Sequence, residues 1–192
     1  KQYPGAAHEP AVLSLLAVSA YNNDNEKDAL KYANDVITRY PDNVAVESAL
    51  AVKAEVEYNR GDLKNALVDY TKLEAHASTT KMLTEARAGV LRSSYDLAKY
   101  DEVIVVADKL LASQISGELK SEVLFKKATS MSNRGKSTNA VEIWTSQRDN
   151  VESVYGAMSA IELGQYYYDN DQLDKARKVV EDLVGSSTPY QY

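Results

Sequence analysis

The chain has 192 residues, of which 44% are hydrophobic and 26% are charged, a balance typical of folded rather than disordered proteins. Its net charge of −6 argues against general nucleic-acid binding, which requires a basic face. The chain has no cysteine, which excludes disulfides and thiolate metal sites, and no apolar run approaches the ~20 residues that cross a bilayer. With only four prolines and eight glycines, it is expected to form long helices rather than many short strands.

The first residues of the chain already belong to a repeated pattern. Tyr3-Pro4 recurs 37 residues later as Tyr40-Pro41. We therefore interpret residues 1–9 as the tail of a preceding repeat, and we predict that the first full repeat covers residues 10–46.

A tyrosine marks one position in most of the repeats. Tyr21, Tyr58 and Tyr95 are 37 residues apart, Ser132 takes the next position, and Tyr168 follows after a step of 36. The residues four positions earlier are small except for Leu91: Ala17, Ala54, Ala128 and Gly164. The residues eight positions later are Ala29, Ala66, Val103, Ala140 and Ala176. These columns define further repeats at residues 47–83, 84–120, 121–156 and 157–192.

Each repeat is predicted to be a pair of helices, and the second repeat shows this best. Apolar residues recur at helical spacing from Ala45 to Asn59 and again from Leu63 to Ala75. Gly61-Asp62 between them is typical of a helix end followed by a helix start, with the Asp62 side chain as the capping acceptor.

Two stretches depart from this pattern. Ile104-Val105-Val106 is β-branched like a strand, but its position in the repeat predicts a helix. In the fourth repeat Thr145-Ser146-Gln147 stands where apolar residues are expected, so its second helix is predicted to be weak. Gly135-Lys136-Ser137 resembles the end of a phosphate-binding loop, but Ser130 occupies the position of the required first glycine, so we interpret the segment as a turn.

The last residues, Ser186 to Tyr192, are interpreted as the lead into a later repeat. Together with the tail at residues 1–9, they predict that this sequence is a piece of a longer repeat protein.

The pattern resembles the tetratricopeptide repeat (TPR), which has small residues at its eighth and twentieth positions, Gly-Asp near the middle and Pro near the end. Ala54, Gly61-Asp62 and Ala66 carry the resemblance in the second repeat, and Leu163-Gly164 carries it in the last. The period of 37 exceeds the usual 34, which implies longer loops between repeats. The resemblance implies an all-α fold, a right-handed α–α superhelix of about five stacked helix-turn-helix units.

The resemblance also implies a function and a kind of partner. The first helices of the units line the concave face of the superhelix, and this face binds peptides or proteins. The Tyr-Pro endings resemble those of bacterial envelope members, such as the periplasmic partner of the Tol–Pal system and the outer-membrane assembly lipoprotein. This narrower likeness implies a periplasmic or outer-membrane-associated location in a bacterium, with the cytoplasm as the alternative.

The tyrosine column is the first candidate binding site. Tyr21, Tyr58, Tyr95 and Tyr168 lie four residues after the small column, on the same helical stripe, and the resemblance places this position toward the groove. Such a ladder would stack on a bound segment or hydrogen-bond to it. The alternative interpretation is that the rings seal contacts between repeats, with their hydroxyls in solvent.

The next column consists of short polar residues that are candidates for gripping the backbone of an extended peptide: Asn22, Asn59, Asp96, Asn133 and Asp169. The alternative is a local role at helix ends, where Asn and Asp accept left-handed conformations. Arg87 and Arg92 are predicted to give the third repeat a positive spot that meets an acidic ligand group, unless they are simply solvated.

Residues for catalysis or metal binding are scarce. The two histidines, His8 and His76, lie far apart in the sequence and at no metal-ligand spacing, and no nucleophile motif is present. We interpret His8 as a linker residue and His76 as a helix-end residue. The sequence therefore predicts a non-enzymatic scaffold without cofactor or metal that binds a protein or peptide. The alternatives are a structural spacer or self-assembly segment with no groove ligand, or part of an enzyme whose catalytic domain lies elsewhere.

Overall fold

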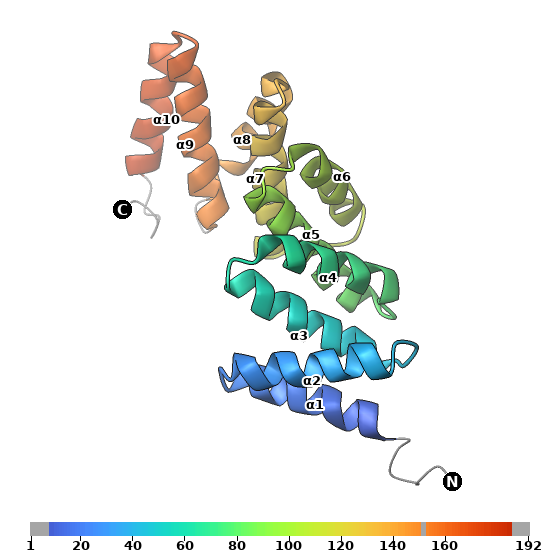
Figure 1. The fold of residues 1–192 in the computed structure, drawn as a ribbon. Helices are drawn as coiled ribbons and strands as arrows, with labels where there is room; N and C mark the ends of the chain where they lie inside the picture. The colour runs from blue at the N-terminus through green and yellow to red at the C-terminus, as the bar shows by residue number, and fades with distance from the viewer. Residues whose placement is uncertain (1–7, 151–152, 186–192) are drawn as a thin grey trace, which may run out of the picture. The chain divides into compact units, whose positions relative to one another are not determined.

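The computed structural model describes residues 8–150 and 153–185 of the chain. Within these ranges the chain forms ten helices and no strand (Figure 1). Their bounds are α1 (Glu9–Asn22), α2 (Glu26–Arg39), α3 (Ala45–Asn59), α4 (Leu63–His76), α5 (Thr80–Asp96), α6 (Tyr100–Leu111), α7 (Gly117–Asn133), α8 (Ser137–Gln147), α9 (Val154–Asp169) and α10 (Leu173–Gly185). The predicted all-α helical repeat fold of the solenoid class is confirmed.

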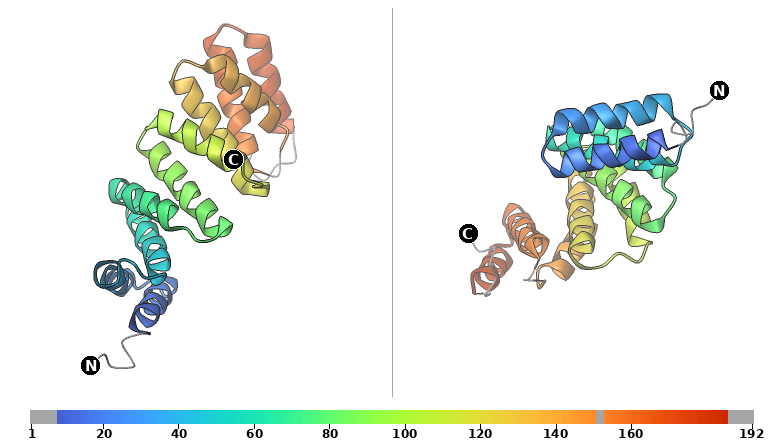
Figure 2. Two further views of the ribbon diagram at one scale, coloured as in Figure 1. Left: turned by 90° about the vertical axis from the view of Figure 1, so that its right-hand side faces the viewer. Right: turned by 90° about the horizontal axis from the view of Figure 1, so that it is seen from below.

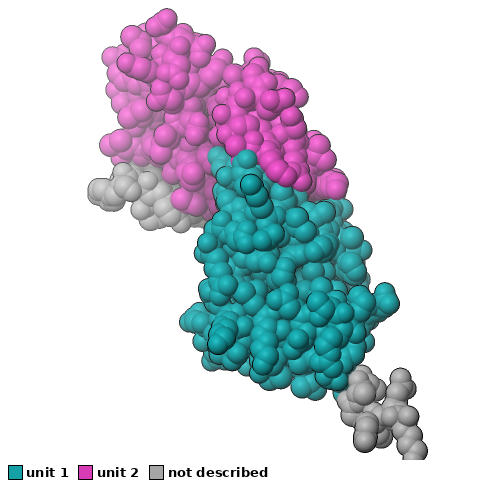
Figure 3. Space-filling view, viewed as in Figure 1, with its two compact units in different colours: residues 1–97 teal, residues 98–192 magenta. Residues whose placement is uncertain are grey.

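The chain divides into two compact units, residues 1–97 and 98–192, which are coloured teal and magenta in Figure 3. Unit 1 contains α1 to α5, and unit 2 contains α6 to α10. The boundary between Leu97 and Ala98 falls inside the third predicted repeat, at the turn after its first helix.

In unit 1, consecutive helices pack in pairs. The α1–α2 and α3–α4 hairpins each bring two antiparallel helices side by side, and α2 packs on α3 as α4 packs on α5 (Figure 2). The small columns lie inside these contacts, because Ala17, Ala29, Ala54 and Ala66 have no exposed surface. Small side chains allow helix axes to approach to about 8–10 Å, which is the physical reason for the alanines.

A glycine and a tyrosine fit together where α4 meets α5. A Cβ atom added to Gly89 of α5 would lie 2.3 Å from the ring of Tyr70 in α4. The Tyr70 ring therefore occupies the space that any other residue at position 89 would need.

The turn inside each repeat has a left-handed residue at the same repeat position. The five residues with positive φ in this column are Asp24 (56°), Gly61 (77°), Ala98 (56°), Gly135 (74°) and Asp171 (58°). Only two of them are glycines. Asp24 and Asp171 are of a residue type that tolerates the left-handed conformation, whereas Ala98 is not. Asp62 stands at the start of α4 as predicted, but its carboxylate accepts a bond from the Asn65 side chain (2.8 Å) and does not cap the helix backbone.

Unit 2 has a core built around two aromatic side chains. Phe125 and Trp144, each 2% exposed, pack with Ala128, Ala140, Ala160, Leu163 and Val179 from α7 to α10. The β-branched stretch at 104–106 is helical, within α6, as its repeat position predicts. The second helix of the fourth repeat, α8, has 11 residues, of which Ala140 and Trp144 are buried, while Thr145 and Ser146 face solvent.

Candidate functional site

The predicted site residues of unit 1 lie at the carboxyl ends of its first helices. Asn22, Asn59 and Asp96 are the last residues of α1, α3 and α5, and a ladder tyrosine precedes each of them. Asn133 and Asp169 end α7 and α9 in the same way in unit 2. The whole polar column is therefore placed by helix termination, and the left-handed residue follows two positions later.

Hydrogen bonds join the two predicted columns in unit 1. The Asn59 side-chain amide donates to the Tyr21 hydroxyl at 3.4 Å, and the Tyr58 hydroxyl donates to Oδ2 of Asp96 at 2.7 Å. Each bond links the tyrosine of one repeat to the polar residue of the next. We call Tyr21, Asn59, Tyr58 and Asp96 the tyrosine ladder. Its hydroxyls are held by the protein, and its rings lie at an intermediate exposure.

Glu55 on α3 adds a negative charge beside the ladder, and the sequence analysis missed it. Burial raises the pKa of Tyr21, and the Glu55 carboxylate raises it further, while the bond from Asn59 opposes the change. Glu55 also accepts a hydrogen bond from the Tyr70 hydroxyl. Burial and this bond raise the pKa of Tyr70, so both phenols stay neutral at physiological pH. Glu55 precedes Asn59 by four residues, and that helical spacing is the signal that would have identified it.

The two arginines predicted to form a positive spot have different surroundings. Arg87 donates to Oε1 of Glu74 at 2.9 Å, so its charge is paired between α5 and α4. Arg92 lies one turn before Asp96 on α5, half-buried, and its positive charge acts to lower the pKa of Tyr70 against the effect of burial. Arg92 is thus the arginine that belongs to the charged surroundings of the ladder.

In unit 2 the same columns make local bonds. The Asn133 side chain donates to the Thr129 carbonyl at 2.8 Å, and Asp169 accepts from the Gln165 side chain at 2.7 Å. Ser132 replaces the ladder tyrosine of the fourth repeat and is too short to span to the next helix. The side chain of Tyr168 is 63% exposed. The structure therefore joins Tyr21 to Asn59 and Tyr58 to Asp96 in unit 1, and it leaves Asn133 and Asp169 bonded within their own helices.

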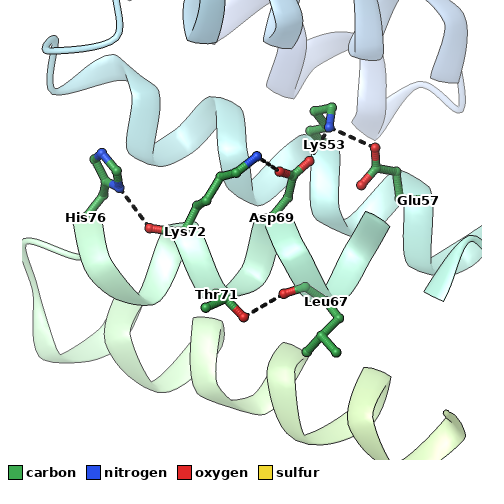
Figure 4. Close-up of polar contacts among 7 residues, drawn as sticks. All are labelled: Lys53, Glu57, Leu67, Asp69, Thr71, Lys72 and His76. Carbon is green, nitrogen blue, oxygen red and sulfur yellow. Dashed lines mark hydrogen bonds and ion pairs between the residues drawn. The ribbon is translucent and has the colours of Figure 1, made fainter. Parts of the chain in front are cut away.

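A second polar cluster, also missed from the sequence, ties α3 to α4 (Figure 4). The carboxylate of Asp69, 2% exposed, pairs with Lys53 and, at 2.7 Å, with Lys72. Lys53 also pairs with Glu57 at 2.9 Å. Burial alone would raise the pKa of Asp69, but the bonds from Lys53 and Lys72 lower it below its usual value. Burial raises the pKa of Glu57.

The two histidines lie apart, at the start of α1 and at the end of α4. His8 is exposed just before α1, and Nδ1 of His76, the last residue of α4, lies 2.8 Å from the Lys72 carbonyl oxygen. No group of three or more His, Asp or Glu side chains in the described ranges is arranged to hold a metal ion. Among the helices described, none has the length and apolar character needed to cross a membrane.

Successive helical hairpins, paired through small residues and joined by first-helix contacts, define an α-solenoid repeat protein. Residues 11–43, which include α1 and α2, match the tetratricopeptide repeat family model. The match covers the first predicted repeat, and the other hairpins share its residue columns. The chain thus contains a match to the tetratricopeptide repeat at residues 11–43, within an all-helical repeat fold.

Several solved structures share this fold at low sequence identity. A tetratricopeptide repeat protein from Parabacteroides merdae is 13% identical, with a TM-score of 0.74 over 92% of this chain, which spans 66% of that protein. The MamA protein is 12% identical, with a TM-score of 0.74 over 93% of this chain and 91% of its own. A kinesin light chain with TPR-like repeats from Podospora anserina is 14% identical, with a TM-score of 0.68 over 92% and 94%. No curated protein sequence matches the chain.

Proposed function

We propose that this chain is a non-enzymatic scaffold that binds a peptide or protein on the first-helix face of unit 1. Tetratricopeptide repeats are generally protein-interaction scaffolds, and this chain has their fold. The tyrosine ladder is the observation that carries the proposal. It presents aromatic rings together with the side chains of Asn59 and Asp96, and both of these side chains are exposed.

The ladder suits an extended peptide because its parts are ordered before a ligand arrives. The bond between Tyr58 and Asp96 fixes the ring orientation, so little side-chain entropy remains to be lost on binding. A carboxylate has more acceptor positions than one hydroxyl occupies, and the amide of Asn59 has both a donor and an acceptor group. Backbone N–H and C=O groups of a ligand fit these side chains.

The charged side chains near the tyrosine ladder favour a ligand of complementary charge. Glu55 and Asp96 put carboxylates beside the ladder, and Arg92 lies one turn away on α5. A segment with a positive charge near Asp96 and Glu55 would complement this face. Such pairing mainly raises the association rate, and it weakens as the salt concentration rises.

The proposal is tested by capturing partners with the full-length protein from its native host and then comparing variants. Exchanging Tyr58 and Tyr95 for Ala is expected to weaken partner binding, with the helical circular-dichroism signal largely retained. Tyr168→Ala is the matched control, because this residue holds the same repeat position on unit 2. Equal weakening by the control, or unfolding without a selective loss of binding, would contradict the proposed site.

A further inference from the structure

Unit 2 contains a hollow beside the missing ladder tyrosine. It has a volume of about 340 Å³ and is lined by residues of α7, α8 and α9 and of the turn that follows α9. The lining residues used in the argument are Ser132, Trp144, Glu162, Gln165 and Asp169. The volume lies at the lower end of the roughly 300–1,000 Å³ typical of small-ligand sites.

The repeat shows what normally fills this position. In unit 1, Tyr58 stands where Ser132 stands in the fourth repeat, and its hydroxyl donates to Asp96 on the next first helix. The counterpart of Asp96 in the last repeat is Asp169, and it also borders the hollow. Ser132 and Asp169 thus keep the two ends of a ladder contact, while the phenol between them is absent from the chain.

Trp144 and Glu162 border the hollow in different ways. The Trp144 side chain is 2% exposed, so its indole forms part of the closed wall. Glu162 is partly buried, and burial raises the pKa of its carboxyl group, which pairs with no cation in the described part of the chain. A carboxyl group without an ion pair on the wall is able to accept a hydrogen bond from a ligand.

We propose that this hollow binds a phenol side chain, namely a tyrosine of a partner polypeptide. The ring takes the place of the missing ladder tyrosine beside Ser132, and its hydroxyl donates to the Asp169 carboxylate, whose Oδ1 accepts from the Gln165 side chain. A phenylalanine would fill the same volume but would leave Asp169 without the added hydrogen bond.

The inference rests on the proposed scaffold function and names one residue that its partner presents. It concerns unit 2, whereas the tyrosine ladder lies in unit 1, so the two sites can be disabled separately. A single side chain in a small hollow contributes selectivity within a longer bound segment.

Trp144 reports directly on the hollow, because it is the one tryptophan in the chain. N-acetyl-tyrosinamide titrated into the protein should change the Trp144 fluorescence saturably, and N-acetyl-phenylalaninamide should bind about five- to tenfold more weakly. Equal binding of the two probes, or no saturable change with either, would overturn the proposal.

Two substitutions at one position sharpen the test. Ser132→Tyr supplies the missing ring from the chain itself and should abolish the response to N-acetyl-tyrosinamide. Ser132→Ala removes only the hydroxyl and should retain the response, and Asp169→Asn should reduce the preference for the tyrosine probe. A Ser132→Tyr protein that still binds the probe would refute the site, once circular dichroism shows that it is folded.

Measuring partner binding and probe binding together distinguishes failure of the phenol site from failure of the ladder site. If a captured partner still binds but Ser132→Tyr changes neither its affinity nor the probe response, the scaffold stands and the phenol site is wrong. If the probe binds as expected and no variant of the tyrosine ladder affects any partner, the phenol site stands and the ladder site is wrong.

Discussion

The hydroxyl of Tyr58 donates a 2.7 Å hydrogen bond to Oδ2 of Asp96, which lies 38 residues further along the chain on the first helix of the next repeat. This bond joins two residue columns that have separate roles in the sequence pattern. The tyrosine side chain is long enough to extend from one first helix to the next, and the carboxylate at the helix end accepts its hydrogen bond. Tyr21 and Asn59 are joined between the same two columns, but there the Asn59 amide donates to the Tyr21 hydroxyl at 3.4 Å.

Removing only the ladder hydroxyl should have a small effect on stability. Tyr58→Phe is expected to lower the free energy of unfolding by about 0.5–1 kcal/mol, because the lost bond is exposed at the helix ends. Chemical denaturation of Tyr58→Phe, Asp96→Ala and the double variant measures the coupling. Strict additivity of the two single effects would show that the bond contributes nothing in solution.

Replacing an alanine by glycine should change stability in opposite directions in a repeat turn and inside a helix. Ala98→Gly should stabilise the protein by about 1 kcal/mol, because Ala98 has a φ of 56° that disfavours a side chain. Ala75→Gly, inside α4, should instead destabilise it by roughly 0.5–1 kcal/mol. Urea denaturation of both variants checks the sign. A destabilised Ala98→Gly protein would contradict the explanation.

The contact between Gly89 and Tyr70 predicts that position 89 does not tolerate a residue larger than glycine. Gly89→Ala should cost roughly 1–3 kcal/mol, since its Cβ would lie 2.3 Å from the Tyr70 ring. Gly164→Ala is the matched control, because its Cβ would meet neighbours at an ordinary 3.8 Å and Ala is the residue at this position in three other repeats. The control should be neutral or slightly stabilising in thermal unfolding. Equal melting temperatures for the two variants would show that the ring moves aside freely.

Because Asp69 is a buried, ion-paired carboxylate, the effect of replacing it on stability should depend on pH. Its pKa is lowered in the folded state, so its stabilising effect is fully present above the ordinary value and is lost as the pH falls through the folded pKa. Asp69→Asn should therefore lower the free energy of unfolding by roughly 1.5–3 kcal/mol at neutral pH, where its bonds to Lys53 and Lys72 are charge-assisted. Denaturation of both proteins from neutral to acid pH checks that the difference shrinks below the ordinary pKa of Asp. A constant difference would exclude ionisation as the cause.

The sequence pattern predicted the helices because the repeat supplies five independent copies of the same evidence. Ala45 to Asn59 was predicted and found as one helix, and α4 extends a single residue beyond the predicted Ala75. The stretch at 104–106 is locally strand-like, yet it is helical because its neighbours in the repeat bury Val103 and Val106 on one helical face. Asp62 shows the limit of this reasoning, since a residue of the right type stands at the helix start and bonds elsewhere.

The candidate site was only partly predictable. The sequence placed Tyr58 and Asp96 in adjacent columns, but their partnership runs between repeats and depends on the packing of α3 against α5. Glu55 and Asp69 were missed because charged residues on amphipathic helices are normally solvated. The burial that makes them exceptional comes from other helices.

By itself, the sequence determined the all-helical class, the repeat and the positions of its turns, because local periodicity and steric preference act within one helix or one hairpin. The tertiary structure alone decided which polar side chains meet, which alanine must take a left-handed conformation and where a hollow opens beside Ser132. These features depend on distances between residues about one repeat apart. The type of a residue and its local sequence do not identify the residue that it contacts after packing.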